Sequence, residues 1–321
     1  MELATSFTEL VGCRWPLQIA PMGVNTPALV VAGAQAGAFP LFATAGLTTA
    51  TVLAMIDAAR EQTDAPIGVN VLIPVLDRAL VEAVAPRVQV FDFYHAPPDP
   101  SLVDLVHQAG ARAEWQVGSV DEAMAAVDAG CDLLVVRGIE GGGRMYGDQP
   151  LLPLLNGVLD AVPSHIPVLA AGGLATARDL AGVLAMGAAG ARMGTRFVAT
   201  AESAAHDVYK QAVVDAAAHE TALVTDFSVM WPNGPEPHRV LRRSLDAAAA
   251  FDGDVVGELD LGGAKIPIPK YAVLPPTVNA TGQLEAFAMY AGTSVGSIQS
   301  VEPTADVVAA IVQGAARLLD R

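Results

Sequence analysis

The chain has 321 residues, of which 52% are hydrophobic and only 5% aromatic, enough for one large core or for a barrel with an appended domain. Its 34 acidic residues outnumber its 18 basic ones, and the net charge of −16 opposes binding to nucleic acid and to anionic membrane surfaces. The two cysteines, Cys13 and Cys131, are too few for a disulfide framework or a zinc cluster, so we expect a cytoplasmic protein.

Residues 15–56 carry no charged side chain, which raises the question of a membrane span. Pro21, Pro27 and Pro40 interrupt this stretch and divide it into strand, turn, helix and strand. We therefore expect a buried βα unit and no membrane segment.

Eight short apolar runs, each ending at a turn or a polar residue, predict the strands of the fold. They are residues 17–20, 39–43, 67–71, 88–94, 112–117, 132–136, 166–170 and 190–193. Helical patterns between them end at glycines that we expect in the left-handed conformation, namely Gly37, Gly110, Gly130 and Gly187. Alternating helices and strands predict a parallel sheet, and eight strands close a (β/α)8 TIM barrel, an α/β fold.

The pattern changes after the eighth strand. Helical sequence over 201–220, a proline- and glycine-rich stretch over 231–238 and a polar helix over 239–250 do not form another βα repeat. We predict that 201–284 is a smaller, mostly helical inserted domain beside the barrel mouth, positioned to act as a lid. Residues 1–200 and 285–321 then form the barrel, which ends in a helix capped at Thr304.

Two glycine-rich turns directly follow the last two predicted strands, at Ala171-Gly172-Gly173 and at Gly194-Thr195. Glycines let backbone N–H groups approach an anion closely, and the loops after strands 7 and 8 of such a barrel are the usual phosphate site. The alternative is that the glycines only shorten the turns.

Seven motifs at the predicted strand ends carry a resemblance to a known family. They are Ala20-Pro21-Met22-Gly23, Gly68-Val69-Asn70, Gln116, Gly138-Ile139-Glu140-Gly141-Gly142-Gly143, Ala171-Gly172-Gly173, Gly194-Thr195-Arg196-Phe197 and Met289-Tyr290-Ala291-Gly292-Thr293-Ser294-Val295-Gly296. In this order the chain resembles the FMN-dependent nitronate monooxygenases, also known as 2-nitropropane dioxygenases, and the related FMN-dependent enoyl-ACP reductases.

The resemblance implies an FMN cofactor over the carboxyl ends of the strands, with its phosphate on the two glycine-rich turns. Met22 and Gly23 would contact the isoalloxazine ring through their backbone, and Asn70 and Gln116 would offer their side-chain amides to polar flavin or ribityl groups. For these two amides, a hydrogen bond within a barrel layer is the alternative. The other cofactor-binding residues implied by the motifs are Pro21, Gly142, Gly143, Ala171, Gly172, Gly173, Gly194, Thr195, Met289, Gly292 and Ser294.

Arg144 departs from the family pattern, which usually has a histidine at this position to act as a base on neutral nitroalkanes. An arginine with a pKa above about 12 is a poor base at neutral pH. It could instead bind a nitronate, a carboxylate or a nucleotide phosphate, or it could be a solvated loop charge.

His95 follows the fourth predicted strand and is the candidate base that this sequence itself offers. Tyr94 and Tyr146 are weaker candidates, and His95 could also be only a hydrogen-bonded structural residue. The other histidines show no metal-ligand spacing, so we expect no metal site.

The preferred function is an FMN-dependent oxidoreductase of the nitronate monooxygenase type, which passes electrons from a small anion to dioxygen. One alternative is an NAD(P)H-dependent FMN reductase of enoyl thioesters or quinones. Another is a barrel that binds FMN or a phosphorylated metabolite without turnover. Assembly into a homo-oligomer stays open.

Overall fold

The computed structural model describes residues 3–261 and 263–320, and eight parallel strands in them close into a barrel. In spatial order they are β1 (Leu17–Ile19), β2 (Phe39–Ala43), β3 (Gly68–Leu72), β4 (Val90–Tyr94), β5 (Arg112–Val117), β6 (Leu133–Arg137), β8 (Val168–Ala171) and β9 (Gly190–Met193). The barrel closes where β9 pairs with β1. The α/β barrel prediction is confirmed, and every predicted apolar run overlaps one of these strands.

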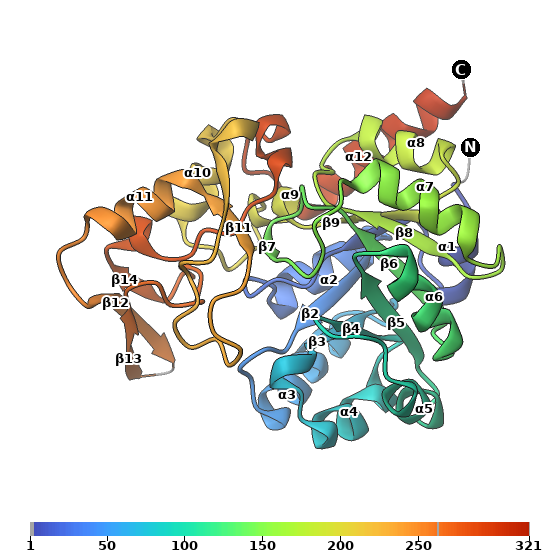
Figure 1. The fold of residues 1–321 in the computed structure, drawn as a ribbon, viewed down its shortest axis with the longest axis horizontal. Coiled ribbons are helices and arrows are strands. Elements are labelled where there is room, and N and C mark those ends of the chain that lie inside the picture. Colours follow the sequence, from blue (N-terminus) through green and yellow to red (C-terminus); the bar gives the residue numbers. More distant parts are fainter. Residues whose placement is uncertain (1–2, 262, 321) are drawn as a thin grey trace.

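Helices surround the barrel (Figure 1). The α-helices of this part are α2 (Pro27–Gln35), α3 (Thr49–Arg60), α4 (Arg78–Val84), α5 (Pro100–Gln108), α6 (Val120–Asp128), α7 (Leu151–Ala161), α8 (Ala177–Ala185), α9 (Thr195–Val198) and α12 (Thr304–Leu319). Short 3₁₀ turns are η1 (Ile73–Val75), η2 (Ala85–Arg87), η4 (Leu284–Ala286) and η5 (Thr293–Ser297). The helix-ending glycines Gly37, Gly110, Gly130 and Gly187 have φ angles of 90°, 83°, 90° and 105°, so the left-handed ends are confirmed.

The first helix, α1 (Ser6–Val11), closes the amino-terminal end of the barrel. Phe7 packs edge-on against Phe39, with ring centroids 6.0 Å apart, and joins a cluster of inward-facing residues near the strand starts, Val90 and Leu133 among them. Apolar packing therefore fills this end, which leaves the carboxyl ends of the strands as the open mouth.

The last helix begins one residue earlier than its predicted cap implies. Thr304 is the first helical residue of α12 and Pro303 precedes it. The backbone N–H of Thr304 donates to Glu202 Oε2 at 2.9 Å, and its hydroxyl donates to the same oxygen at 2.7 Å. A carboxylate from the start of the insertion therefore caps the helix, in place of Thr304 itself.

The insertion contains as much strand as helix. Its helices are α10 (Asp207–Asp215), η3 (Ala218–Glu220) and α11 (Arg242–Ala250), and its strands are β10 (Thr221–Val224), β11 (His238–Leu241), β12 (Val255–Leu261), β13 (Ala264–Pro269) and β14 (Ala280–Gly282). The prediction of a mostly helical insertion is therefore wrong, because short strands with glycine and proline lack the long apolar runs of the barrel strands. The limits 201 and 284 remain a prediction.

A small sheet joins the insertion to the barrel. The two-residue strand β7 (Gly143–Arg144), in the loop after β6, pairs antiparallel with β11, and Arg144 lies opposite His238. Figure 1 shows β7 and β11 between the barrel and the insertion. The loop after β6 is therefore held by both parts of the chain.

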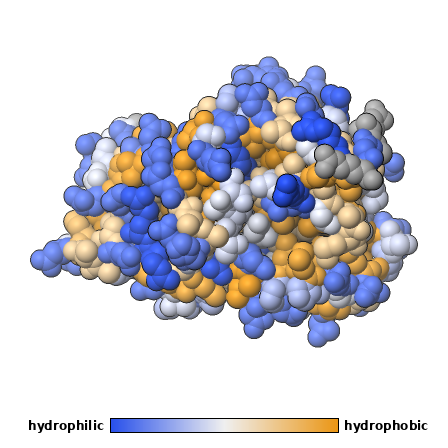
Figure 2. Space-filling model, turned by 90° about the horizontal axis from the view of Figure 1, so that it is seen from above, coloured by the Kyte–Doolittle hydropathy of each residue, from blue (hydrophilic) through white to orange (hydrophobic). Residues whose placement is uncertain are grey.

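No helix of the described residues is long and apolar enough to cross a bilayer. Figure 2 shows hydrophilic and hydrophobic residues mixed over the visible face.

Candidate active site

Backbone packing joins the loops after β6 and β8. Gly172 and Gly173 have φ angles of 108° and 71°. A Cβ atom on Gly172 would lie 2.8 Å from the carbonyl oxygen of Gly138, and one on Gly173 would lie 2.9 Å from Cβ of Glu140. Because both the conformation and the space exclude a side chain, only glycine fits either position.

The segment before η5 completes this arrangement. A Cβ atom on Gly142 would lie 2.6 Å from the nitrogen of Gly292, so these two segments of the chain touch through their backbones. The N–H of Gly292 donates to Thr195 Oγ1 at 3.0 Å, and that of Thr293 donates to the Glu140 carbonyl at 3.0 Å. The structure therefore brings together predicted cofactor residues from four separate segments, and the nearby Met289 and Ser294 are buried.

The loop after β1 lies against the second glycine turn. A Cβ atom on Gly194 would lie 3.3 Å from Cβ of Ala20 and 3.6 Å from Sδ of Met22. Gly23 faces the insertion, where its Cβ atom would lie 3.5 Å from Cγ of Pro275. Pro21 and Met22 are half-buried at this edge of the mouth.

This cradle fits the phosphate end of a flavin nucleotide. It consists of backbone from the carboxyl ends of β8 and β9, where Gly172 and Gly173 exclude side chains and the Thr195 hydroxyl accepts from the Gly292 N–H. Such backbone suits a phosphate because N–H groups can surround the anion at short range. FMN at this position, with Gly143 and Ala171 beside it, remains a prediction.

Asn70 and Gln116 each use one end of the side-chain amide inside the barrel. Asn70 Nδ2 donates to Asp92 Oδ2 at 2.8 Å, and Gln116 Oε1 accepts from Arg192 Nη1 at 3.1 Å. Asn70 Oδ1 and Gln116 Nε2 bond to no described residue. The barrel-layer hydrogen bond thus exists for both amides, while their other ends remain available to a ligand.

Arg192 is the centre of a charged cluster that the sequence analysis missed. Its guanidinium lies 3.0 Å from Asp92 Oδ2 and 2.5 Å from Glu114 Oε2, and Nε donates to Gln18 Oε1 at 2.5 Å. All four side chains are buried. Burial raises the pKa of Asp92 and raises that of Glu114 to about 8, although the Arg192 charge opposes both shifts. In the sequence, the members of this cluster are visible only as single polar residues inside otherwise apolar strands.

A cavity of about 480 Å³ lies at the opposite side of the mouth, over β4, β5 and the loop after β6. It is lined by His95, Gly118, Ser119, Glu122, Met145, Tyr146, Gly147, Asp148, Gln149, Glu236 and Pro237. In the barrel, β4 and β5 stand across from β9 and β1. The cavity therefore lies across the mouth from the glycine cradle, and the loop after β6 contributes to both.

His95 is buried in the wall of this cavity. Its φ angle of 76° is unusual for a residue with a side chain, and such strain is found preferentially at functional sites. Nε2 lies 2.6 Å from Glu236 Oε2, while Nδ1 is buried with no partner among the described residues. Burial lowers the pKa of His95, although the hydrogen bond to Glu236 opposes this shift.

Glu236 was missed by the sequence analysis because it lies 141 residues from its partner, with no local pattern between them. Trp231 Nε1 donates to Glu236 Oε2 at 2.5 Å, and Asn233 Nδ2 donates to Oε1 at 3.2 Å. Burial acts to raise the pKa of Glu236, but the hydrogen bonds from His95 and Trp231 outweigh it and lower the pKa. Glu236 is therefore an anionic partner fixed against His95.

Arg144 fastens the insertion to the loop after β6. Nη2 donates to the Phe227 carbonyl at 2.7 Å, and Nη1 donates to Ser228 Oγ at 3.2 Å and to the Glu236 carbonyl at 3.3 Å. The guanidinium also lies 4.5 Å from the Trp231 ring centroid. The alternative of a solvated loop charge is wrong, because Arg144 is only 8% exposed. Anion binding stays a prediction that relies on its remaining N–H groups.

The weaker base candidates have other contacts. The buried Tyr94 hydroxyl donates to the Arg144 carbonyl at 3.1 Å, which makes Tyr94 a support of the loop. The Tyr146 ring lies in the cavity wall, 5.3 Å from the His95 ring. Of the three candidates, His95 alone has a buried side-chain polar atom without a partner among the described residues.

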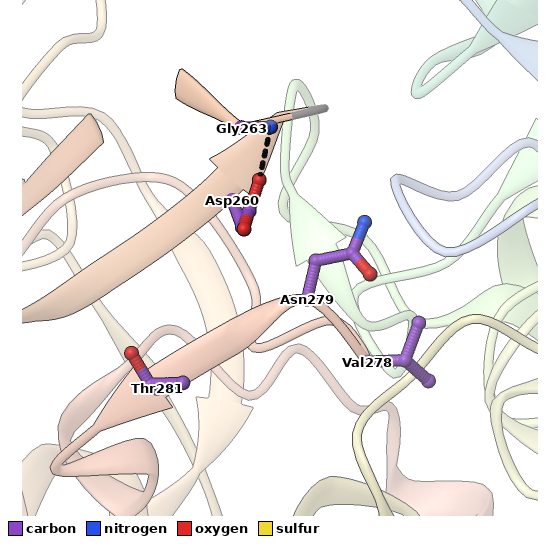
Figure 3. Close-up of a pocket in the computed structure, with 5 residues that line it drawn as sticks. All are labelled: Asp260, Gly263, Val278, Asn279 and Thr281. Atoms are coloured by element: carbon purple, nitrogen blue, oxygen red, sulfur yellow. Dashed lines mark hydrogen bonds between the residues drawn. The ribbon is translucent and has the colours of Figure 1, made fainter. Parts of the chain in front are cut away.

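A second depression lies on the insertion (Figure 3). It is lined by Asp260, Gly263, Val278, Asn279 and Thr281 and has a volume of about 580 Å³. Asp260 Oδ1 accepts a hydrogen bond from the Gly263 N–H at 2.7 Å. This groove is larger than the barrel cavity, but it contains none of the predicted site residues, so we assign the site to the barrel mouth.

The fold is a closed parallel barrel with a glycine-rich backbone cradle on one side of its mouth and the buried pair of His95 and Glu236 on the other, which agrees with a flavin oxidoreductase of the TIM-barrel class. The family model described as "Nitronate monooxygenase" matches residues 75–314, and the chain belongs to this family.

Relatives within the family have different activities. The chain is 37% identical over 249 residues to (3aS,4S,5R,7aS)-5-hydroxy-7a-methyl-1-oxo-octahydro-1H-indene-4-carboxyl-CoA dehydrogenase from Mycobacterium tuberculosis, covering 76% of this chain and 68% of that protein. It is 29% identical over 290 residues to a nitronate monooxygenase from Pseudomonas aeruginosa, covering 76% and 82%.

Solved structures agree with this placement. FabK from Thermotoga maritima matches with a TM-score of 0.79 at 25% identity, covering 98% of this chain and 97% of that chain. Nitroalkane oxidase from Streptomyces ansochromogenes matches with a TM-score of 0.79 at 25% identity and covers 98% of both chains. The recognition of the family from its motifs is confirmed.

Proposed function

We propose that the chain is an FMN-dependent oxidoreductase that removes hydrogen from the acyl part of a CoA thioester. The observation that carries this proposal is His95, a cavity-lining imidazole that is paired with Glu236 and whose buried Nδ1 has no partner among the described residues. A carbon next to a thioester carbonyl loses its proton only to a positioned base. The 37% identity to a carboxyl-CoA dehydrogenase supports the same substrate class.

The charge of the cavity supports a neutral acyl group. Its lining includes Glu122, Asp148 and Glu236 and no lysine or arginine. An anion such as a nitronate would meet carboxylates at this wall, whereas an uncharged ring or chain would not. The anionic CoA portion would then lie outside the cavity.

The pair of His95 and Glu236 has the chemistry of a base and its orienting partner. With the Nε2 proton donated to Glu236, Nδ1 is the nitrogen that would take a proton from the substrate carbon. Nδ1 has no exposed surface in this structure, so the wall around it must move for the substrate to reach it. Burial lowers the pKa of His95, which favours the neutral ring that a base requires. The carboxylate of Glu236 then stabilises the imidazolium that forms.

When bound, FMN supplies the acceptor for the two electrons of the oxidation. The glycine cradle and Thr195 would hold its phosphate, and Met22, Gly23, Asn70 and Gln116 would hold its ring and ribityl chain. The insertion residues around Trp231 exclude water from His95.

Proton abstraction is tested by exchange of the substrate hydrogen in D₂O. We expect the protein to exchange the hydrogen next to the carbonyl of cyclohexanecarboxyl-CoA, measured by mass spectrometry, and His95→Gln to slow this exchange about 100-fold or more. His107→Gln is the matched control, because His107 pairs with Asp132 at 2.7 Å on the surface, away from the cavity. Equal exchange by the wild type and His95→Gln would refute the proposal.

The direction of the reaction is tested by anaerobic mixing. Bleaching of bound FMN by the saturated thioester, with no bleaching by NADH or NADPH, supports a dehydrogenase. Rapid bleaching by NADH or NADPH supports the alternative, a reductase of enoyl thioesters or quinones.

Oxidation of alkyl nitronates with dioxygen is the second candidate function, and the family match and the Pseudomonas aeruginosa relative favour it. A nitronate arrives already deprotonated and needs no base, which agrees with arginine at position 144. This function predicts turnover of nitronates far above that of neutral nitroalkanes, with no loss in His95→Gln. Oxygen consumption with each form of the substrate distinguishes it from thioester oxidation.

A further inference from the structure

The charged cluster around Arg192 forms one layer of the barrel interior. Asn70, Asp92 and Glu114 are register neighbours on β3, β4 and β5, so their side chains form a row on the same inner face. Gln18 and Arg192 are register neighbours on β1 and β9, across the barrel from that row. The guanidinium spans the interior and contacts both carboxyl groups.

The charges of this layer do not balance if both carboxyl groups are ionised. Asp92 and Glu114 have no exposed side-chain surface, and among the described residues Arg192 is the one cation in contact with them. A buried net negative charge is costly, and the usual response is that one group takes up a proton. Burial alone therefore argues for one proton in the layer.

The hydrogen bonds indicate where this proton lies. Both oxygens of Glu114 accept hydrogen bonds, from Gln18 Nε2 at 3.0 Å and from Arg192 Nη2 at 2.5 Å. Asp92 Oδ1, in contrast, is fully buried and has no donor among the described residues. A hydroxyl on Glu114, the register neighbour of Asp92, would provide that donor and neutralise the layer in one step.

The same layer fixes the orientation of two amides. Since Asn70 Nδ2 donates to Asp92, the oxygen of Asn70 is left for a ligand. Since Gln116 Oε1 accepts from Arg192, the NH₂ group of Gln116 is left for a ligand. If the Asn70 amide were flipped, its oxygen would face the Asp92 carboxylate, and if the Gln116 amide were flipped, its NH₂ group would face the Arg192 guanidinium.

We propose that Glu114 carries a proton shared with Asp92, and that Asp92 and Arg192 act as positioning residues which present the Asn70 carbonyl and the Gln116 NH₂ group to the cofactor. The first part concerns the barrel alone, and the second rests on the proposed FMN site. An acceptor and a donor in fixed positions match the alternating N–H and C=O groups of a flavin ring edge.

Infrared spectroscopy tests the proton without any need for activity. We expect the purified protein at pH 6.5 to show the C=O stretch of a protonated carboxylic acid, sensitive to D₂O, and Glu114→Gln to lack it. Glu114→Gln replaces the acid by a neutral group of similar shape, so we expect it to fold. The exposed Glu9→Gln is the control and should keep the band. A wild type without the band, or a Glu114→Gln protein that keeps it, would overturn the proposal.

Flavin binding tests the positioning role separately. We expect Asp92→Leu to weaken FMN binding about 10-fold or more and to shift the visible flavin spectrum, because Asn70 and Arg192 lose their acceptor, while Glu114→Gln stays within about 3-fold of wild type. Unchanged spectrum and affinity in a folded Asp92→Leu protein would refute the positioning role. If Asp92→Leu does not fold, Gln116→Glu tests the other amide, since it removes the NH₂ group that Arg192 orients, and unchanged FMN affinity in that variant would also refute the positioning role. A wild type that binds no FMN would refute the FMN site and leave the infrared result as it stands.

Discussion

The two sides of the barrel mouth are built in different ways. The side over β8 and β9 is made of backbone, where glycines of the loops after β6 and β8 and of the segment before η5 touch and leave no room for side chains. The side over β4 to β6 is made of side chains that bond to the insertion. His95 bonds to Glu236, and Arg144 donates to the Phe227 carbonyl. A backbone site can be recognised from its local sequence, whereas a side-chain site depends on contacts that only the folded chain provides.

The largest effect should come from a side chain added to the glycine cradle. Gly172→Ala would place a Cβ atom 2.8 Å from the Gly138 carbonyl oxygen, at a φ angle of 108°. We expect the variant to lose FMN affinity by about 100-fold or more, measured by fluorescence titration, because two loops of the cradle must move apart.

Gly46→Ala is the matched control, because Gly46 also has a left-handed φ angle, 78°, but meets nothing within 4 Å. It should cost about 1 kcal/mol of stability and leave FMN affinity unchanged. Normal FMN binding by Gly172→Ala would show that the cradle is not the phosphate site.

An intermediate effect is expected on the side made of side chains. Arg144→Ala removes the donors to the Phe227 and Glu236 carbonyls and the stacking on Trp231. We expect a loss of about 2–4 kcal/mol in the free energy of unfolding, because buried carbonyls lose their partners, and faster proteolysis within 225–238.

The exposed Arg243 provides the control for Arg144. It pairs with Glu285 at 2.8 Å on the surface, and Arg243→Ala should cost at most about 1 kcal/mol. If the two variants lost the same stability, Arg144 would not hold the insertion.

The sequence predicted the barrel well because its signals are local. Each strand is an apolar run, and glycines such as Gly110 and Gly187 mark the left-handed helix ends that precede strands. The cradle was predictable for the same reason, since Gly172 and Gly194 directly follow their strands.

The charged layer and the base pair were harder to predict, for different reasons. Asp92, Glu114 and Arg192 are each visible as polar residues inside apolar strands, but their mutual contact requires the closed barrel. Glu236 has no signal at all, because its role depends on how the insertion folds back over His95. The strands of the insertion were missed because none has a long apolar run.

The smallest effect concerns pH, which should act on only one side of the mouth. The cradle glycines do not titrate, whereas the other side contains His238, a buried ring whose Nδ1 donates to the Glu236 carbonyl at 2.9 Å and whose Nε2 accepts from the Phe227 N–H at 3.2 Å. Burial lowers the pKa of His238 to about 4, below the value of about 6.5 in an unfolded chain.

Since the unfolded state binds the proton more readily, His238 contributes stability above pH 6.5 that is lost as the pH falls toward 4, at a rate of up to about 1.4 kcal/mol per pH unit. His238→Asn should be less stable than wild type at pH 7, and the difference should shrink by pH 4.5 in denaturant titrations. The exposed His165→Gln should follow the wild-type curve at both values. A constant difference between wild type and His238→Asn would mean that His238 does not titrate on unfolding, and the pH sensitivity of the mouth would then have to come from His95 and Glu236.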